Sequence, residues 1–598
     1  METAPIEHHG LIGDLQTAAL VAEDGSIDWF CAPRFDSPSI FAALVDDGHA
    51  GGGLCRFRPE RDDFVSRQLY LPGTAILITR FMSPEGVGEV LDFMPVTGYE
   101  PSERHQIVRV MRMVRGHGRF VFECSPAFDY GRAEPDIDIT ESGVVFTGGG
   151  QALTLNPGRT ELASQIERVN GGIRVVLDAH EGDSGGMVLT AGPSETPRTV
   201  ATDEIWRLYA RTRDYWRGWV GQSRYTGRWR EQVERSAVTL KLLTYAPTGA
   251  PVAAPTAGLP ELVGGERNWD YRYTWIRDAS LSVHALLGLG YRDEARAFLS
   301  WLRDRVTEGE PRIMYRIDGS TDLPELELQH LRGYRGSKPV RIGNDANGQL
   351  QLDVYGEALD AMYRGFRSGL RPAYDGWSAF TRGIDRLCDS WDRPDDGIWE
   401  SRSGRHDNTY GRLMCWVAFD RAIRIARVLG APADLPRWTA ARDAVYEQVM
   451  ARGWNPDAET FTQHYETDVV DAALLYMPIV GFIAPEDPRW LSTLEAIDEH
   501  LVSDSLVYRY DPLKSPDGLA GAEGTFSMCT FWYVEALVRA GRLDEARLTF
   551  EKMLTYSNYV GLYAEEIGPT GEQLGNFPQA FSHLGLINAA VRLDRALG

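Results

Sequence analysis

The sequence predicts an antiparallel β-sandwich followed by a predominantly α-helical domain. Its 598 residues exceed what one hydrophobic core normally supports, so two domains are expected. Up to about residue 200, short apolar or alternating runs are broken by Gly, Asp and Pro, whereas later apolar residues recur every three to four positions. The first pattern is typical of strands and the second of helices. We therefore predict a β domain at 1–200, a helical linker at 201–225 and a helical domain at 226–598.

The β domain is predicted from runs that are rich in β-branched and aromatic residues. Such runs occur at Thr74–Phe81, Gln106–Val114, Arg119–Cys124, Gly143–Thr147 and Ile173–Asp178. Their alternation of apolar and polar residues indicates antiparallel strands with one buried face. Many short strands separated by turn residues favour a sandwich.

The helices are predicted from the longer period. Glu204–Val220 is the linker helix, and Trp229–Leu243, Leu413–Leu429 and Phe531–Ala540 each place their apolar residues on one face. The segment Ala246–Pro260 contains several prolines, which lack an N–H and clash with the preceding turn of a helix. It therefore ends the first helix of the helical domain and continues as a long loop.

Composition excludes several classes of partner. A net charge of −23 argues against nucleic acid and against an anionic membrane surface, since both attract positive charge. The six cysteines are scattered without a C-x-x-C pair, which predicts neither a metal site nor a disulfide framework. The chain has no basic and apolar leader and no apolar run of about 18 residues. We expect a cytoplasmic protein with reduced thiols, no cofactor and a small neutral ligand.

The segment Arg267–Asp278 is the strongest functional signal. It places four aromatic rings, three guanidinium groups and two carboxylates within twelve residues. Aromatic faces cover the C–H faces of a sugar ring, and Arg and Asp bind its hydroxyls, so we predict a carbohydrate pocket. The alternative is that the rings pack in the core and that Asp278 caps a helix beginning at Ala279.

Three other segments combine polar and aromatic residues. The loop at His330–Asp353 is typical of a cavity lining or of a plain surface loop, and a helix is expected to begin near Gln349. Trp399 next to Glu400 could raise the pKa of this carboxyl, as a proton donor requires, or could simply pack in the core. Glu565–Glu566 could be a catalytic carboxylate or a solvated pair. One proton-donating carboxyl and one ionised carboxylate suffice for glycosidic bond cleavage.

At this point the motifs resemble a known family. Trp269–Asp278, Ile398–Glu400 and Tyr563–Glu566 resemble glycoside hydrolase family 15, the glucoamylase family. Four other segments look like the bacterial branch that includes trehalases: His9–Asp14, Gly25–Ser37, Gly333–Asn344 and Leu574–His583. The resemblance covers essentially the whole chain. It implies a β-sandwich joined by a helical linker to an (α/α)6 barrel with the pocket at one end.

The resemblance also implies the reaction and the roles of the residues. The expected reaction is exo-attack on an α-glucosyl unit with inversion and release of β-glucose. Glu400 corresponds to the general acid and Glu565 to the general base. Glu566 stands where glucoamylases commonly carry Gln; its charge could raise the pKa of the base, and it is the alternative for that role. The substrate contacts that the resemblance assigns are Tyr271, Trp275, Arg277, Asp278, Arg341, Trp399, Glu566 and Arg509.

The choice of substrate is the least constrained prediction. Trehalose is favoured, because it is small and neutral and because the chain shows no starch-binding module. The alternative is a glucoamylase-type or isomaltose-type exo-α-glucosidase. A sugar phosphorylase is disfavoured by Glu565, since a phosphorylase needs an anion site where the base would lie. A noncatalytic sugar sensor would tolerate replacement of either carboxylate.

Overall fold

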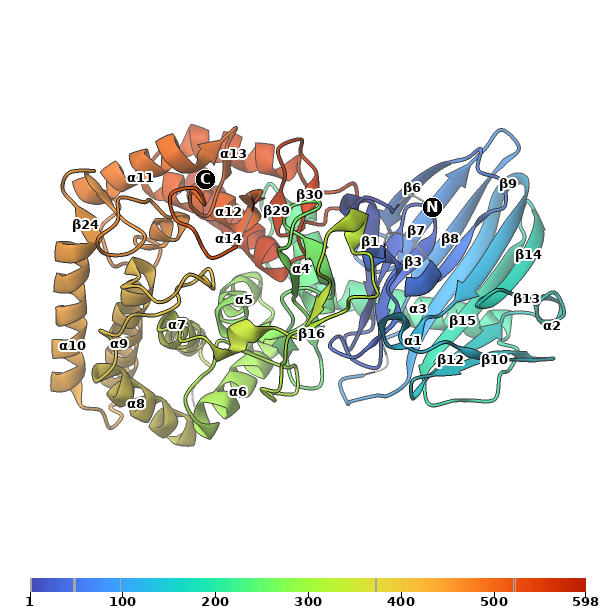
Figure 1. Ribbon diagram of the computed structural model, residues 1–598, viewed down its shortest axis with the longest axis horizontal. Helices are drawn as coiled ribbons and strands as arrows, with labels where there is room; N and C mark the ends of the chain where they lie inside the picture. Colours follow the sequence, from blue (N-terminus) through green and yellow to red (C-terminus); the bar gives the residue numbers. More distant parts are fainter. Residues whose placement is uncertain (1–2, 47–49, 97, 371–373, 520, 522) are drawn as a thin grey trace.

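The computed structural model describes residues 3–46, 50–96, 98–370, 374–519, 521 and 523–598. An antiparallel β domain, blue to cyan in Figure 1, lies beside a ring of helices coloured green to red. Trp29 of the β domain donates a hydrogen bond from its indole N–H to the carbonyl of Pro255, at 2.7 Å. The two parts are therefore packed against each other through buried side chains.

Strand β9 (His105–Ser125) joins the two sheets of the β domain. Its C-terminal half pairs with β5 (Leu54–Pro59) and β14 (Gly172–His180). Its N-terminal half pairs with β8 (Gly86–Phe93) and β15 (Ser184–Gly192). All of these pairs are antiparallel, and the alternating burial of strands such as β14 places one face in the core.

The remaining strands extend the two sheets. The first sheet also contains β1 (His9–Gly13), β2 (Ala18–Ala22), β3 (Ser26–Cys31), β4 (Ser39–Phe41) and β13 (Glu167–Val169). The second contains β6 (Val65–Tyr70), β7 (Leu77–Met82), β10 (Asp136–Thr140), β11 (Gly143–Gly148) and β12 (Gln151–Pro157).

The two strands predicted at Gln106–Val114 and Arg119–Cys124 are wrong as separate elements, because both belong to β9. The intervening residues suggest a turn in the sequence. In the structure Gly116 has a φ of 72° and the pairing with β8 shifts register nearby. Such a bulge bends a strand without ending it, which lets β9 pass from one sheet to the other.

The helical part is an (α/α)6 barrel in which outer and inner helices alternate along the chain. The outer helices are α4 (Arg230–Leu242), α6 (Arg292–Glu308), α8 (Tyr374–Cys388), α10 (Leu435–Gln448), α11 (Pro488–Leu501) and α13 (Leu543–Leu554). The inner layer consists of α5 (Ile276–Leu289), α7 (Asp353–Arg367), α9 (Thr409–Leu429), the 3-10 helix η7 (Ala472–Tyr476), α12 (Ser527–Arg539) and α14 (Ala580–Leu597). In Figure 1, α8 and α10 lie outside α7 and α9.

The two layers differ in their pattern of burial. Inner helices such as α9 and α12 are buried at most positions along their length. Outer helices such as α6 and α13 bury only a stripe of apolar residues, as expected for helices with one face in water. None of the described helices is long and apolar enough to cross a membrane.

Helix α3 (Thr202–Val220) confirms the helix predicted at Glu204–Val220, and its role as a linker stays a prediction. It lies between the last strand of the β domain and α4, and we propose the boundaries 1–200, 201–225 and 226–598 for the domains.

The starts of two helices of the barrel differ from the predicted ones. Helix α5 begins at Ile276, so Asp278 lies in its first turn and is not its cap.

Helix α7 begins at Asp353 rather than near Gln349. The backbone N–H of Leu350 donates to the Asp396 carboxylate at 2.7 Å, and that of Leu352 donates to Asp395 at 3.1 Å. These side chains from a distant loop satisfy donors that would otherwise begin the helix. Tertiary contacts therefore delay the helix by one turn.

Candidate active site

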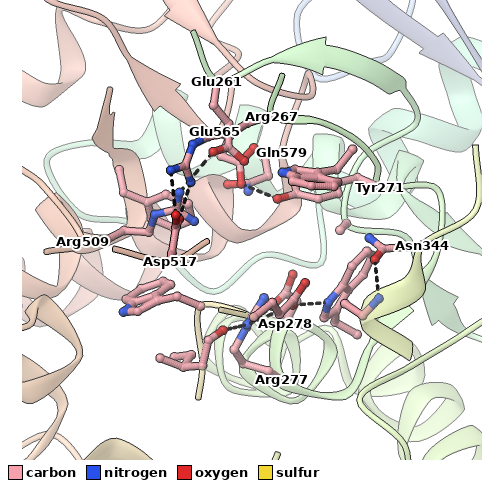
Figure 2. A pocket seen from close by; sticks show the side chains of 18 of the residues that line it. Glu261, Arg267, Tyr271, Arg277, Asp278, Asn344, Arg509, Asp517, Glu565 and Gln579 are labelled. Atoms are coloured by element: carbon pink, nitrogen blue, oxygen red, sulfur yellow. Dashed lines mark hydrogen bonds and ion pairs between the residues drawn. The ribbon is translucent and has the colours of Figure 1, made fainter. Parts of the chain in front are cut away.

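A pocket of about 730 Å³, its open mouth included, lies at the end of the barrel where the inner helices begin. Figure 2 shows it from close by. It brings together eight of the ten residues singled out in the sequence: Tyr271, Trp275, Arg277, Asp278, Trp399, Glu400, Arg509 and Glu565. They come from segments that lie up to about 300 residues apart but that all precede or begin inner helices.

The predicted carbohydrate segment divides its three arginines among different tasks. Arg277 lines the pocket, and Arg267 lines it while forming an ion pair with Asp517 at its Nη2, 3.0 Å from Oδ1. Arg272 turns away: it forms an ion pair with Asp270 at 2.6 Å and donates to the carbonyl of Ser37 in the β domain at 2.9 Å. The segment therefore both lines the site and fastens it to the β domain.

Glu400 is held by groups at the start of α5. The indole Nε1–H of Trp275 donates to Glu400 Oε1 at 2.6 Å, and Arg277 Nη1 lies 3.7 Å from the same oxygen. Arg277 also donates to Asp278 and to the carbonyl of Ile398, each at 2.7 Å. Burial raises the pKa of Glu400, while Arg277 and Trp275 oppose this rise.

Two details of Glu400 go beyond the sequence prediction. The indole that contacts it is Trp275 and not its neighbour Trp399, whose Nε1–H donates to Asp471 at 3.0 Å. Glu400 also has a φ of 60°, in a left-handed region that non-glycine residues seldom adopt. Such strain persists only where the surrounding structure enforces it, and it is frequent at functional sites.

Glu565 is held from the other side of the pocket by an aromatic residue of the same segment. The Tyr271 hydroxyl donates to Glu565 Oε1 at 2.7 Å, while Oε2 is buried without a hydrogen-bond partner among the described residues. The Tyr271 and Trp275 rings meet edge to face with centroids 5.4 Å apart. Two neighbouring rings therefore each position one carboxyl group.

A buried cluster of acids surrounds Arg509 behind Glu565. Arg509 donates to Glu523 and Glu261, the latter at 3.2 Å, and lies 3.4 Å from Glu566. Burial and the charge of Glu261 raise the pKa of Glu565, whereas Arg509 lowers it. Burial also raises the pKa of Glu261, to about 7. The like charge that acts most on Glu565 is therefore that of Glu261, which the sequence analysis did not single out.

The same acids are the best candidates for a metal site in the described part of the chain. Oxygen atoms of Glu261, Glu523 and Glu566 lie within 4.8 Å of one another. The guanidinium of Arg509 contacts all three. Because Arg509 already supplies the positive charge that a cation would bring, we assign no metal to this cluster.

Two predicted contact residues do not line the pocket. Glu566 is fully buried and accepts a hydrogen bond from the Gly524 N–H at 2.8 Å. Arg341 donates to the carbonyl of Glu266 at 2.5 Å and stacks over the Trp269 ring at 4.7 Å. Both therefore support the pocket from behind its surface.

The pocket also contains residues that the sequence analysis did not select. These are chiefly Glu261, Trp269, Asn344, Arg402, Asp517 and Gln579. Trp269 was visible as a ring of the aromatic segment, but its partner was not: the Arg402 guanidinium stacks over it at 4.4 Å. Asp517 lies 250 positions from Arg267, and no local pattern could have paired them.

The arrangement can bind a polar, uncharged ring and transfer protons on two sides of it. Most charged groups that line it are paired: Arg277 with Asp278, Arg267 with Asp517 and Arg509 with the buried acids. The carboxyls of Glu400 and Glu565 each accept a hydrogen bond from a neutral aromatic donor, and Arg277 lies 3.7 Å from Glu400. Burial raises the pKa of both carboxyls above that of an ordinary Glu, which favours proton exchange with a substrate.

Comparison with known proteins places the chain in a family. Residues 227–591 match the family described as glycosyl hydrolases family 15, and residues 1–216 match a trehalase-like N-terminal domain. A protein named trehalase from Thermoplasma volcanium is 38% identical over 595 residues, covering 99% of this chain and 94% of its own. Another trehalase, from Mycolicibacterium smegmatis, is 38% identical and covers 99% and 92%.

A solved structure shares the whole fold. A bacterial glucoamylase complexed with acarbose superposes with a TM-score of 0.73 and 14% identity, over 100% of this chain and 94% of the glucoamylase. At this identity the likeness concerns the fold alone. The match over residues 227–591, with the 38% identity to the two trehalases over nearly the whole chain, shows that the chain belongs to glycosyl hydrolase family 15.

Proposed function

We propose that this chain is an inverting α,α-trehalase, which hydrolyses trehalose to two glucose molecules. The observation that carries the reaction is that Glu400 and Glu565 line one pocket and each receives a hydrogen bond from an aromatic side chain. The choice of trehalose is supported by the relatives named trehalase, which match nearly the whole chain.

In this mechanism Glu400 is the general acid and Glu565 the general base. Glu400 gives its proton to the glycosidic oxygen while the bond from that oxygen to the anomeric carbon breaks. Glu565 takes a proton from a water molecule whose oxygen attacks the same carbon from the opposite face. One glucose leaves with the glycosidic oxygen, and the other gains the water oxygen with inverted configuration. The proton on Glu565 then returns to solvent, and Glu400 is reprotonated.

The first glucose would be bound by the residues at the start of α5. Arg277 and Asp278 form an ion pair at 2.7 Å, and this pair offers donors and acceptors to neighbouring hydroxyls. Tyr271 and Trp275 present ring faces and edges to the sugar. We assign the second glucose to the side of the pocket lined by Trp399 and Arg509, whose guanidinium lies 5.7 Å from the Trp399 ring.

A substrate panel tests the assignment. Purified protein is incubated separately with trehalose, maltose, isomaltose and soluble starch, and released glucose is measured. We expect kcat/KM to be highest for trehalose. If trehalose yields no glucose while maltose or isomaltose does, the enzyme is an exo-α-glucosidase of another specificity. If glucose 1-phosphate appears in phosphate buffer, it is a phosphorylase.

The stereochemistry is tested on the same reaction. Proton NMR of the first products from trehalose should show α- and β-glucose in equal amounts, because only the attacked carbon inverts and the leaving glucose keeps its α configuration. Release of α-glucose alone would show retention and would remove Glu565 from the role of base.

We also propose that the enzyme acts in the cytoplasm. All six cysteines are free thiols, and Cys55 and Cys124 face each other as register partners on β5 and β9. An oxidising compartment favours pairing of such neighbours. When the source cells are lysed in denaturant with an alkylating reagent, mass spectrometry of the protein should find all six cysteines alkylated. A disulfide between Cys55 and Cys124 would contradict this location.

A further inference from the structure

A second cavity lies at the end of the barrel opposite the proposed active site. It has a volume of about 660 Å³, its open mouth included, and forms where the C-terminal parts of α5, α7, α12 and α14 meet. Its charged and titratable lining consists of His284, Arg364, Glu535, Arg539, Arg592 and Arg595. None of these residues has a part in the proposed hydrolysis.

The arginines of this cavity are largely unpaired. Arg364 donates to Asp360 at 2.5 Å. In contrast, Arg539, Arg592 and Arg595 form no ion pair with any residue that the structure describes. Among the described lining residues, Glu535 is the one carboxylate. Three unpaired guanidinium groups facing one carboxylate leave an excess of positive charge, although the whole chain is strongly acidic.

Arg539 shows that this charge is compensated only in part. Its Nε is buried and has no hydrogen-bond partner in the described structure. Burial and the like charge of Arg592 lower the pKa of Arg539, and the charge of Glu535 opposes this in part. Burial, chiefly, and the charge of Arg364 lower the pKa of His284 to about 3, so this imidazole is neutral at physiological pH. A buried N–H without a partner is costly, and a bound anion would relieve that cost for Arg539.

Compensation of helix dipoles explains only part of this arrangement. Arginines are favoured near the C-terminal ends of helices because these ends carry partial negative charge. Arg427, exposed in the last turn of inner helix α9, fits that explanation without lining the cavity. The dipoles do not account for the convergence of arginines from three helices on one cavity, nor for the buried Nε of Arg539.

We propose that this cavity binds a phosphate group. Guanidinium groups form paired, charge-assisted hydrogen bonds with phosphate oxygens, and several of them can bind one dianion. The amide of Asn588, which also lines the cavity, adds a neutral donor. The phosphate is either inorganic phosphate or part of a small metabolite such as a sugar phosphate.

Binding is measured on the full chain by calorimetry and by thermal unfolding at constant ionic strength in chloride buffer. The probes are inorganic phosphate and glucose 6-phosphate. We expect saturable binding and a rise in Tm for the wild type, and at least a tenfold increase in Kd for Arg592→Gln and Arg539→Gln. The matched control is Arg427→Gln, which removes the same charge from the same kind of helix end and should bind as the wild type does.

The outcomes separate the possibilities. Equal affinity for both probes identifies the phosphate group alone as the ligand, whereas tighter binding of glucose 6-phosphate shows that a sugar phosphate is recognised. Absence of saturable binding in the wild type would overturn the proposal. So would an Arg592→Gln variant with wild-type Kd, or a loss of binding in Arg427→Gln equal to that in Arg592→Gln. Circular dichroism verifies that each variant is folded, and none of these readouts depends on hydrolysis.

Discussion

The two sides of the pocket hold their carboxyl groups in different electrostatic surroundings. Glu400 lies near one ion pair, formed by Arg277 and Asp278. Glu565 lies in front of a buried group of acids that share Arg509. Figure 2 shows Arg277 and Asp278 on one side of the pocket and Arg509, Glu261 and Glu565 on the other. Burial therefore dominates the pKa of Glu400, whereas like charge adds to burial at Glu565.

This difference shows how one pocket can control the pKa values of its two carboxyl groups in different ways. On the Glu400 side, protonation is favoured by desolvation and limited chiefly by the charge of Arg277. On the Glu565 side, the protons belong to a coupled set of carboxyls, so that ionisation of one member depends on the others. The ionisation of the proposed base therefore depends on the acids grouped around Arg509. That of the proposed acid depends chiefly on Arg277 and Trp275, which contact it directly.

The largest expected effect is the loss of either carboxyl. Glu400→Gln and Glu565→Gln should each lower kcat by about 10²–10⁴-fold with modest change in substrate binding, because proton transfer is removed and shape is kept. Steady-state kinetics with trehalose measures this. Glu327→Gln, at an exposed glutamate, is the control. Near-normal turnover in either variant would remove that residue from the mechanism.

The second largest effect is a loss of folding stability, which we expect when the cation on the Glu565 side of the pocket is removed. Arg509→Gln removes the cation that contacts three buried carboxylates and should cost about 3–5 kcal/mol in the free energy of unfolding. The pKa values of Glu565 and Glu566 are raised in the folded state, so the folded protein binds more protons and stability falls as pH rises above the ordinary Glu value.

Without Arg509 these pKa values should rise further, and the loss of stability should therefore grow with pH. Urea unfolding at several pH values measures it. Arg277→Gln, which removes the cation from buried Asp278 and from the neighbouring Glu400, is the comparison. An equal loss of stability in both variants, or a loss at the Arg509 position that does not depend on pH, would mean that the two sides do not differ as described.

The third effect comes from the two aromatic donors and should appear on opposite limbs of the pH profile. Tyr271→Phe removes a hydrogen bond that lowers the pKa of Glu565, so the acidic limb of kcat/KM should move to higher pH. Trp275→Phe removes a hydrogen bond that lowers the pKa of Glu400, so the basic limb should move to higher pH. Each loss is expected to cost about 1.5–3 kcal/mol of interaction. A shift of the same limb in both variants would contradict the assignment of acid and base.

The smallest expected effect is a shift of the pH profile of kcat/KM without loss of maximal activity. Glu261→Gln removes the charge that contributes most to raising the pKa of Glu565. The base should then ionise at lower pH, and the acidic limb should move down by about one pH unit. A pH series of kcat/KM measures it. Glu572→Gln, at a partly exposed acid seven residues after Glu565 in the sequence, serves as control. An unchanged acidic limb in Glu261→Gln would show that Glu261 does not act on the base.

Much of the fold was predictable from local patterns. Helices α9 and α12 begin within a few residues of their predicted starts, because their apolar period is strong. The start of α7 and the continuity of β9 were not predictable. The first depends on hydrogen bonds from Asp395 and Asp396, and the second on a bulge at Gly116 that resembles a turn in the sequence.

The sequence alone determined the family and eight residues that line the pocket, because their motifs are contiguous and each precedes or begins an inner helix. Only the tertiary structure decided the surroundings of each carboxyl: that Trp275 rather than Trp399 contacts Glu400, and that Glu261 lies near Glu565. A motif fixes chemistry within a short segment, whereas a pKa depends on burial and on charges that approach from anywhere in the chain.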